Sequence, residues 1–190
     1  MSLYKNKYRN ESSRLNGWDY SNDGQYFITI CTHDRQCLFG KVINGIMQLS
    51  EIGKIVHEEW NKSFEIRDEL FCDVWILMPN HLHAIVRICG DCGDGRPSVR
   101  TELGDDCGAG RPSVRTGIAY RSPKSISSFI AGFKSSATKK INELRCMPRV
   151  PVWQTRFHDH IIRNEEEYIR IERYINVNPD KWEEDKFITE

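Results

Sequence analysis

The sequence has no apolar run that approaches the roughly 20 residues a helix needs to span a bilayer. Its first residues, from Met1 to Tyr8, are polar and lack the apolar core of a signal peptide. It also lacks net charge, because 27 basic side chains balance 27 acidic ones, and this argues against a general polyanion binder. These absences predict a cytoplasmic protein with no membrane partner.

Cysteines are present, but their pattern does not predict a disulfide framework. The seven cysteines are an odd number and several lie inside apolar segments, so we expect buried, reduced thiols. Cys89-Gly90-Asp91-Cys92 has the C-x-x-C form, yet no second pair follows at zinc-ribbon spacing. A metal or redox site at this motif is therefore not favoured.

The length of 190 residues predicts a single domain over 1–190 with one interruption. From about residue 90 to 121 the composition becomes rich in glycine. Within this stretch Gly-Arg-Pro-Ser-Val-Arg-Thr occurs at 95–101 and again at 110–116. Two copies are too few for a solenoid, so we predict a flexible repeat insertion.

The stretch that organises the chain is Met78-Pro79-Asn80-His81-Leu82-His83. Apolar segments flank it, and Pro-Asn is typical of a turn, so we predict two buried strands joined as a hairpin. Side chains two residues apart leave the same face of a strand, which would place His81 and His83 together and turn Leu82 into the core. Two converging imidazoles on a rigid sheet form half of a metal site, although many His-x-His pairs have no such role.

A second pair of the same spacing, His158-Asp159-His160, lies in a predicted strand from Val150 to Ile162. This pair is a rival for the metal. It could equally be a structural pair, or it could support the first pair from outside the metal shell. The sequence leaves these alternatives open.

Other patterns outline the rest of the fold. A first strand is predicted at 26–32, a hairpin around Asn44-Gly45, a helix at 51–62 capped by Ser50, and a helix with an apolar stripe from Ser125 onward. Between Arg121 and Val150 seven basic residues face one acid, Glu143. Lysines on a helix surface are often merely solvated, but so one-sided a segment favours phosphate contacts.

The last predicted helix starts at Asn164 and ends at Pro179. Tyr174 and Asn178 are four residues apart and therefore share a face, whereas Tyr168 lies on a different face. A tyrosine on a terminal helix usually serves packing. The neighbouring amide and the upstream histidines make a chemical role worth considering here.

These strings together resemble the HUH-type single-tyrosine transposases, in the branch of the REP-associated tyrosine transposases. The resemblance rests on residues 19–20, 26–31, 78–83, 133–136, 153–163 and 174–179. It implies an α/β (α+β) fold, a ferredoxin-like sandwich in which helices pack on a central antiparallel sheet. It also implies that His81 and His83 bind a metal, that Tyr174 is the nucleophile, and that Asn178 completes the metal shell where relatives often have glutamine.

The implied cofactor is a divalent metal ion, Mg²⁺ or Mn²⁺, and the implied partner is single-stranded DNA that bears a hairpin. Such a protein would cleave and rejoin DNA through a 5′-phosphotyrosine intermediate, either alone or as a homodimer. The candidate DNA-binding residues are Lys134, Lys139, Lys140, Arg121 and Arg163. Two other functions stay open from the residues alone: a metal-dependent hydrolytic nuclease, and a non-catalytic binder of hairpin DNA.

Overall fold

The computed structural model describes residues 3–4, 8–9, 14–15, 17–90 and 124–184. Its main elements, in chain order, are β3 (Gly24–Cys31), β4 (Gly40–Ile43), β5 (Ile46–Leu49), α1 (Glu51–Glu65), β6 (Leu70–Leu77), β7 (His81–Ile88), α2 (Ile126–Leu144), β8 (His158–Ile162) and α3 (Glu165–Asn176). Short elements complete the list: β1 (Leu3–Tyr4), β2 (Tyr8–Arg9), and the 3-10 turns η1 (His33–Arg35) and η2 (Trp182–Glu184).

The central sheet has four strands in the order β6-β7-β3-β8, and every neighbouring pair is antiparallel. With α1 between β3 and β6, and α2 between β7 and β8, the chain follows the β-α-β-β-α-β order of a ferredoxin-like fold. The predicted fold class is therefore confirmed. The histidine pair lies on β7, one of the two central strands.

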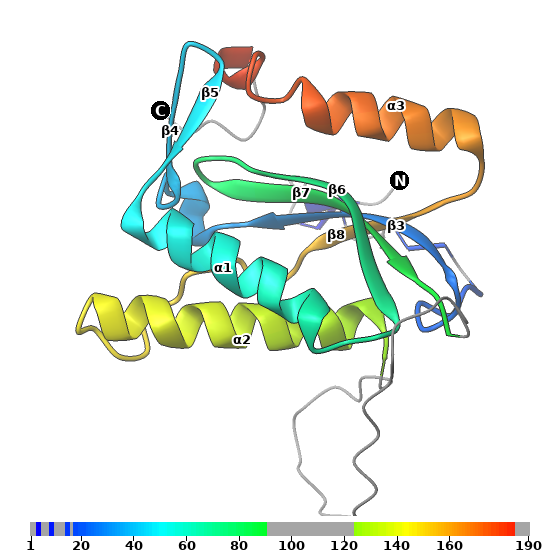
Figure 1. The fold of residues 1–190 in the computed structure, drawn as a ribbon, viewed down its shortest axis with the longest axis horizontal. Helices are drawn as coiled ribbons and strands as arrows, with labels where there is room; N and C mark the ends of the chain where they lie inside the picture. The colour runs from blue at the N-terminus through cyan, green and yellow to red at the C-terminus, as the bar shows by residue number, and fades with distance from the viewer. Residues whose placement is uncertain (1–2, 5–7, 10–13, 16, 91–123, 185–190) are drawn as a thin grey trace, which may run out of the picture.

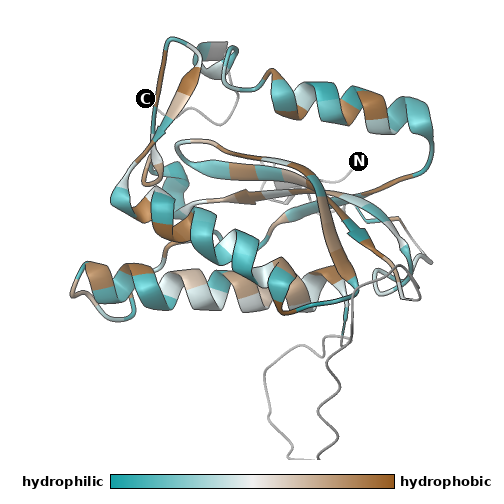
Figure 2. Ribbon diagram, in the orientation of Figure 1, coloured by the Kyte–Doolittle hydropathy of each residue, from teal (hydrophilic) through white to brown (hydrophobic). Residues whose placement is uncertain are grey.

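Helices cover both faces of this sheet (Figure 1). α1 and α2 lie side by side on one face, and α3 crosses the other. The larger apolar core fills the first face, where Trp60 of α1 and Phe133 of α2 are almost fully buried. A smaller cluster, Ile85, Ile162, Ile171 and Ile175, holds α3 against the second face. Figure 2 shows polar and apolar residues interspersed along each helix, as expected for elements with one buried side.

Local sequence explains where the helices begin. The side chains of Ser50, Ser125 and Asn164 each accept a hydrogen bond from the backbone N–H three residues later. These are N-caps, which satisfy one of the free amides of a first helical turn. At the other end of α3, the helix stops at Asn176, shortly before Pro179.

The strand predicted from Val150 to Ile162 is too long, because β8 begins only at His158. The segment before β8 pairs with the sheet through an isolated bridge between Thr32 and Trp153. Alternation of apolar residues there reflects a loop that buries Val152 and Trp153 rather than a strand. The repeat insertion predicted at about 90–121 lies, from residue 91 onward, outside the described residues.

The cysteines agree only partly with the prediction of buried thiols. Cys31 is a buried free thiol, whereas the free thiols of Cys37 and Cys146 are exposed. Cys89 is disulfide-bonded, which was not predicted, and the C-x-x-C motif that it begins extends outside the described residues. No helix in the described part of the chain has the length and apolar character needed to cross a membrane.

Candidate active site

The two histidines of β7 converge as the spacing predicted. Their rings are 4.5 Å apart between centroids, and the two residues are 0% and 1% exposed. Leu82, between them, points to the opposite face and joins the larger core. His81 and His83 therefore lie on the α3 face of the sheet, where β7 is flanked by strands on both sides.

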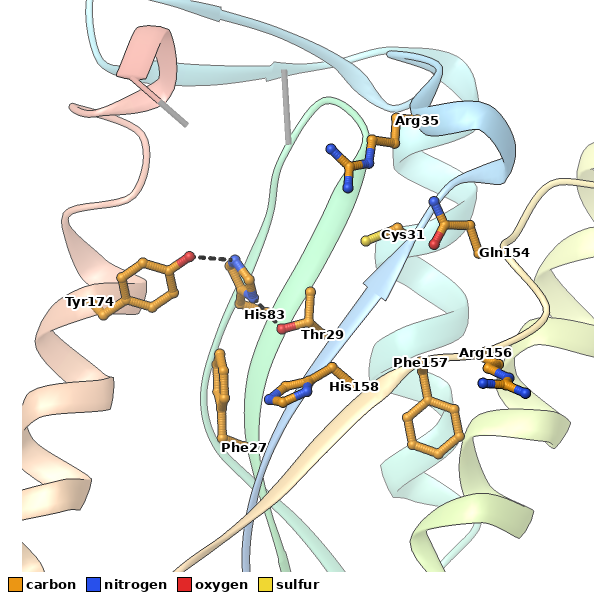
Figure 3. Close-up of a pocket in the computed structure, with 10 residues that line it drawn as sticks. All are labelled: Phe27, Thr29, Cys31, Arg35, His83, Gln154, Arg156, Phe157, His158 and Tyr174. Carbon is orange, nitrogen blue, oxygen red and sulfur yellow. Dashed lines mark hydrogen bonds between the residues drawn. The ribbon is translucent and has the colours of Figure 1, made fainter. Parts of the chain in front are cut away.

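The neighbouring strand fixes the ring of His83. Thr29 lies directly opposite His83 on β3, and its Oγ1 is 2.8 Å from Nδ1 of the imidazole. On the other side of the ring, Nε2 is 3.1 Å from the hydroxyl of Tyr174. Because both hydroxyls can donate and accept, either neutral tautomer of His83 satisfies these two contacts, with one ring nitrogen donating and the other accepting. Figure 3 shows this chain of contacts running from α3 to β3.

The turn before β7 fixes the ring of His81. Asn80 donates from Nδ2 to the backbone carbonyl of Arg35 at 3.1 Å, and this contact sets the orientation of its amide. Oδ1 of Asn80 then lies 2.8 Å from Nδ1 of His81. Because a carbonyl oxygen can only accept, Nδ1 must carry the proton, which leaves the lone pair of His81 on Nε2.

Tyr174 reaches this pair from α3. Its ring packs 5.1 Å from that of His83 and 6.2 Å from that of Phe27, and the residue is 37% exposed. The phenol is thus held in place on one side and open to the cleft on the other. The residues that the sequence suggested for a shared site, His83 and Tyr174, are brought together within one chain.

Asn178 follows one turn after Tyr174 and is buried, at 4% exposure. Within the described residues, its side-chain oxygen Oδ1 is enclosed and accepts no hydrogen bond. Such an atom ordinarily costs stability unless something else satisfies it. Asn178 also lies in sequence between Tyr174, which contacts His83, and Trp182, whose ring is 6.1 Å from that of His81.

These residues fit a divalent cation. In the described part of the chain no three His, Cys, Asp or Glu side chains gather closely enough to hold one. The candidate donors are instead Nε2 of the two histidines, that of His83 in contact with Tyr174, and the buried amide oxygen of Asn178. Two imidazoles and one amide oxygen would leave coordination positions open, which is characteristic of a catalytic rather than a structural metal site.

A cleft with a volume of about 510 Å³ opens beside Tyr174 and His83 (Figure 3). Its walls combine aromatic, polar and basic side chains: Phe27, Thr29, Cys31, Arg35, Gln154, Arg156, Phe157 and His158. Sequence reasoning missed all of these except His158. The strand register would have found Thr29, because it lies opposite His83, but the sequence alone does not give the register.

The rival pair on β8 is different in its surroundings. His160 donates from Nε2 to Oε1 of Glu167 at 2.9 Å, and so ties β8 to the first turn of α3. His158 is exposed and lines the cleft, with its ring 6.1 Å from that of Phe27. The structure thus gives His160 a structural contact and places His158 beside the cleft.

The predicted DNA-binding residues are spread over several surfaces. Lys134 donates to the backbone carbonyls of Gln154 and Arg156, at 2.8 and 3.3 Å, and thereby holds the cleft wall. Lys140 pairs at 2.5 Å with the buried carboxylate of Glu59, linking α2 to α1. Lys139 lines a separate shallow groove with Arg149, and Arg163 is exposed near the start of α3. Arg121 lies outside the described residues.

Comparison with known proteins gives two informative matches. An uncharacterized protein of Haemophilus influenzae is 33% identical over 182 residues, which cover 92% of this chain and 91% of that protein. A solved structure of the REP-associated tyrosine transposase bound to a REP hairpin superposes with a TM-score of 0.54 at 18% identity, covering 92% of this chain and 76% of the other. No family model matches the sequence. The resemblance drawn from the sequence motifs is thus confirmed at the level of the fold.

Proposed function

The chain belongs to the same protein family as the Haemophilus influenzae protein and has the fold of a REP-associated tyrosine transposase, and on this basis we propose that it is a DNA strand transferase. Its nucleophile would be Tyr174, and its product a 5′-phosphotyrosine link. The observation that carries this proposal is the 3.1 Å contact between the Tyr174 hydroxyl and Nε2 of His83, at the edge of an open cleft.

The chemistry needs a nucleophile, a way to handle its proton and a place for the phosphate. Attack by the phenol oxygen on phosphorus forms one P–O bond and breaks the bond to the 3′ oxygen, which takes up a proton. The contact with His83 positions the phenol and Thr29 orients the ring; the phenol proton passes to solvent in the open cleft, because an Nε2 that binds a metal ion cannot accept it. Because the phosphodiester energy is kept in the tyrosine ester, a second strand can reverse the step and be joined.

A divalent metal ion, Mg²⁺ or Mn²⁺, would be held by His81, His83 and Asn178. When bound, it would supply Lewis-acid stabilisation for the charge that develops on the phosphate and on the departing oxygen. The protein's own contribution is to orient the donors. Asn80 and Thr29 hold the two imidazole rings through their Nδ1 atoms, so that Nε2 of each ring is the nitrogen a metal ion would take, in His83 by displacing the Tyr174 hydroxyl.

The proposed substrate is single-stranded DNA that bears a hairpin. The solved transposase with the same fold is bound to a REP hairpin. In the present chain, aromatic Phe27 and Phe157 and basic Arg35 and Arg156 line the cleft, a combination that suits bases and phosphates of an unpaired strand. The proposed homodimer is not required to bring the nucleophile to the site, since Tyr174 and His83 meet within one chain.

The test uses a hairpin-flanked single strand with Mn²⁺ or Mg²⁺, scored for a protein–DNA adduct on a denaturing gel. We expect Tyr174→Phe to abolish the adduct while leaving oligonucleotide binding largely intact. Tyr168→Phe is the matched control, because Tyr168 lies on the same helix but packs in the small apolar cluster. DNA cleaved without an adduct would instead indicate a hydrolytic nuclease, and an adduct of normal yield from Tyr174→Phe would reject this tyrosine as the nucleophile.

A further inference from the structure

Arg35 lines the cleft and has no assigned role in the proposed reaction. It is half-buried in the 3-10 turn after β3, and its side chain lines the same cleft as His83 and Tyr174. Figure 3 shows its guanidinium turned toward the side of the cleft where the phenol meets the imidazole. Arg156 also lines the cleft, but in the same view its guanidinium points away from Tyr174.

The backbone of Arg35 is held in an unusual conformation. Asp34 and Arg35 have φ angles of 53° and 54°, in the left-handed region that side chains other than glycine seldom adopt. Thr32 anchors the turn, because its hydroxyl oxygen lies 2.9 and 3.0 Å from the carbonyl oxygens of Gln36 and Asn80 and shares its one hydrogen between them. Glycine would adopt this backbone conformation at position 35 without strain, so Arg35→Gly can remove the side chain and keep the turn.

The carbonyl of Arg35 has a second use at the same site. It accepts the 3.1 Å hydrogen bond from Asn80 that orients the amide toward His81. One residue therefore does two things: its main chain helps to set the tautomer of His81, and its side chain supplies positive charge to the cleft. The two roles can be separated by experiment, because Arg35→Gly keeps the backbone carbonyl and removes the guanidinium.

We propose that Arg35 is a phosphate-binding catalytic residue, whose guanidinium contacts the nonbridging oxygens of the phosphodiester attacked by Tyr174. This inference rests on the proposed function. The guanidinium stays protonated throughout and exchanges no proton; the phenol loses one proton and the departing 3′ oxygen gains one. A planar guanidinium can donate two parallel hydrogen bonds to a phosphate, and its charge offsets the negative charge that builds up during attack. Lys134 is less suited to this role, because a lysine ammonium does not present the two parallel donors of a guanidinium to a phosphate.

The experiment compares wild type with Arg35→Gly and Arg35→Lys, using hairpin-flanked single-stranded DNA at saturating concentration. Three quantities are measured: the rate of adduct formation, the Kd for DNA, and the Kd for Mn²⁺ by water-proton relaxation. Arg35→Gly fits the left-handed backbone and keeps the carbonyl, so we expect the adduct rate to fall about 100-fold while Mn²⁺ affinity changes less than about threefold. Arg35→Lys keeps the charge but loses the paired donors, so its adduct rate should lie between those of wild type and Arg35→Gly. Lys54→Gln, an exposed charge on α1, is the control for the loss of one cation.

Asn80→Ala tests the role of the Arg35 carbonyl, since it removes the side chain that links this carbonyl to His81. We expect it to weaken Mn²⁺ binding by about tenfold, in contrast to Arg35→Gly. An Arg35→Gly protein with wild-type adduct rate would overturn the role of Arg35 and leave the proposed function standing. Absence of any adduct from wild type would overturn both. If Arg35→Gly does not fold, a wild-type adduct rate in Arg35→Lys overturns the requirement for paired donors on which the proposal depends.

Discussion

The two His-x-His pairs look alike in sequence but differ in almost every physical respect. His81 and His83 lie on a central strand, are almost fully buried, and have their Nδ1 atoms fixed by Asn80 and Thr29. His158 and His160 lie on the edge strand β8, where one is exposed and the other is bound to Glu167. Spacing alone therefore does not separate a candidate metal pair from a structural pair; burial and the hydrogen-bond partners of the ring nitrogens do.

The largest expected effect comes from removing either histidine of the first pair. His81→Ala or His83→Ala should lower Mn²⁺ affinity and the rate of adduct formation by at least about 100-fold, because each removes a proposed ligand. Isothermal titration with Mn²⁺ and the denaturing gel measure the two quantities. His160→Gln, in the second pair, should leave both within about threefold of wild type. Equal losses from the two pairs would remove the distinction drawn between them.

A smaller effect is expected from the residue that orients His83. Thr29→Val removes the hydroxyl next to Nδ1 and keeps the shape of the side chain, so Mn²⁺ affinity should fall by about tenfold. Thr29→Ser keeps the hydroxyl and should retain most of the affinity. If valine and serine behave alike, the contact to Thr29 does not determine how His83 binds a ligand.

Removing the contact between Tyr174 and His83 should raise Mn²⁺ affinity, whereas the preceding substitutions lower it. Nε2 has one lone pair, which cannot accept the phenol hydrogen and bind a cation at the same time. Tyr174→Phe should therefore raise Mn²⁺ affinity, by about threefold, which is typical of losing one competing hydrogen bond. Titration of the two proteins in the absence of DNA measures this difference. Weaker Mn²⁺ binding by the phenylalanine variant would show that the phenol assists the ion instead of competing with it.

The second pair should affect stability and its pH dependence more than metal binding. Burial alone would raise the pKa of Glu167, but hydrogen bonds from the backbone of Arg163 and from His160 outweigh it and hold the pKa below its ordinary value of 4.5. The carboxylate therefore stabilises the fold above pH 4.5, and this contribution is lost as the pH falls through the lowered pKa. Glu167→Gln should be less stable than wild type by about 1 kcal/mol at pH 7.

Urea denaturation at several pH values tests this prediction. The difference in unfolding free energy between Glu167→Gln and wild type should shrink as the pH falls below 4.5, where wild type loses the charge as well. A difference that stays constant from pH 7 to pH 3 would mean that the charge of Glu167 does not stabilise the fold.

Most of the fold could be predicted from local patterns. The Pro-Asn turn, the cap residues Ser50 and Asn164, and the apolar strands around His81 each act over a few residues, and all are found in the structure. The strand predicted from Val150 failed because Val152 and Trp153 are buried by a loop, and burial alone does not distinguish a loop from a strand.

The site was only partly predictable, for a related reason. The spacing of His81 and His83, and of Tyr174 and Asn178, shows which side chains share a face within one element. Thr29 and Arg35 became recognisable only through contacts made across strands, since Thr29 depends on register and Arg35 on a left-handed turn. A single sequence contains no direct signal for either.

The central claim is that Tyr174 becomes covalently joined to DNA at the site of the first histidine pair. The most direct measurement is mass spectrometry of the adduct formed with a hairpin-flanked single strand and Mn²⁺, after digestion with protease and nuclease. The account predicts a 5′-phosphonucleotide on the peptide that contains Tyr174, together with a free 3′-hydroxyl on the released strand. A nucleotide attached to any other residue, or a 3′-phosphate on the released strand, would contradict it.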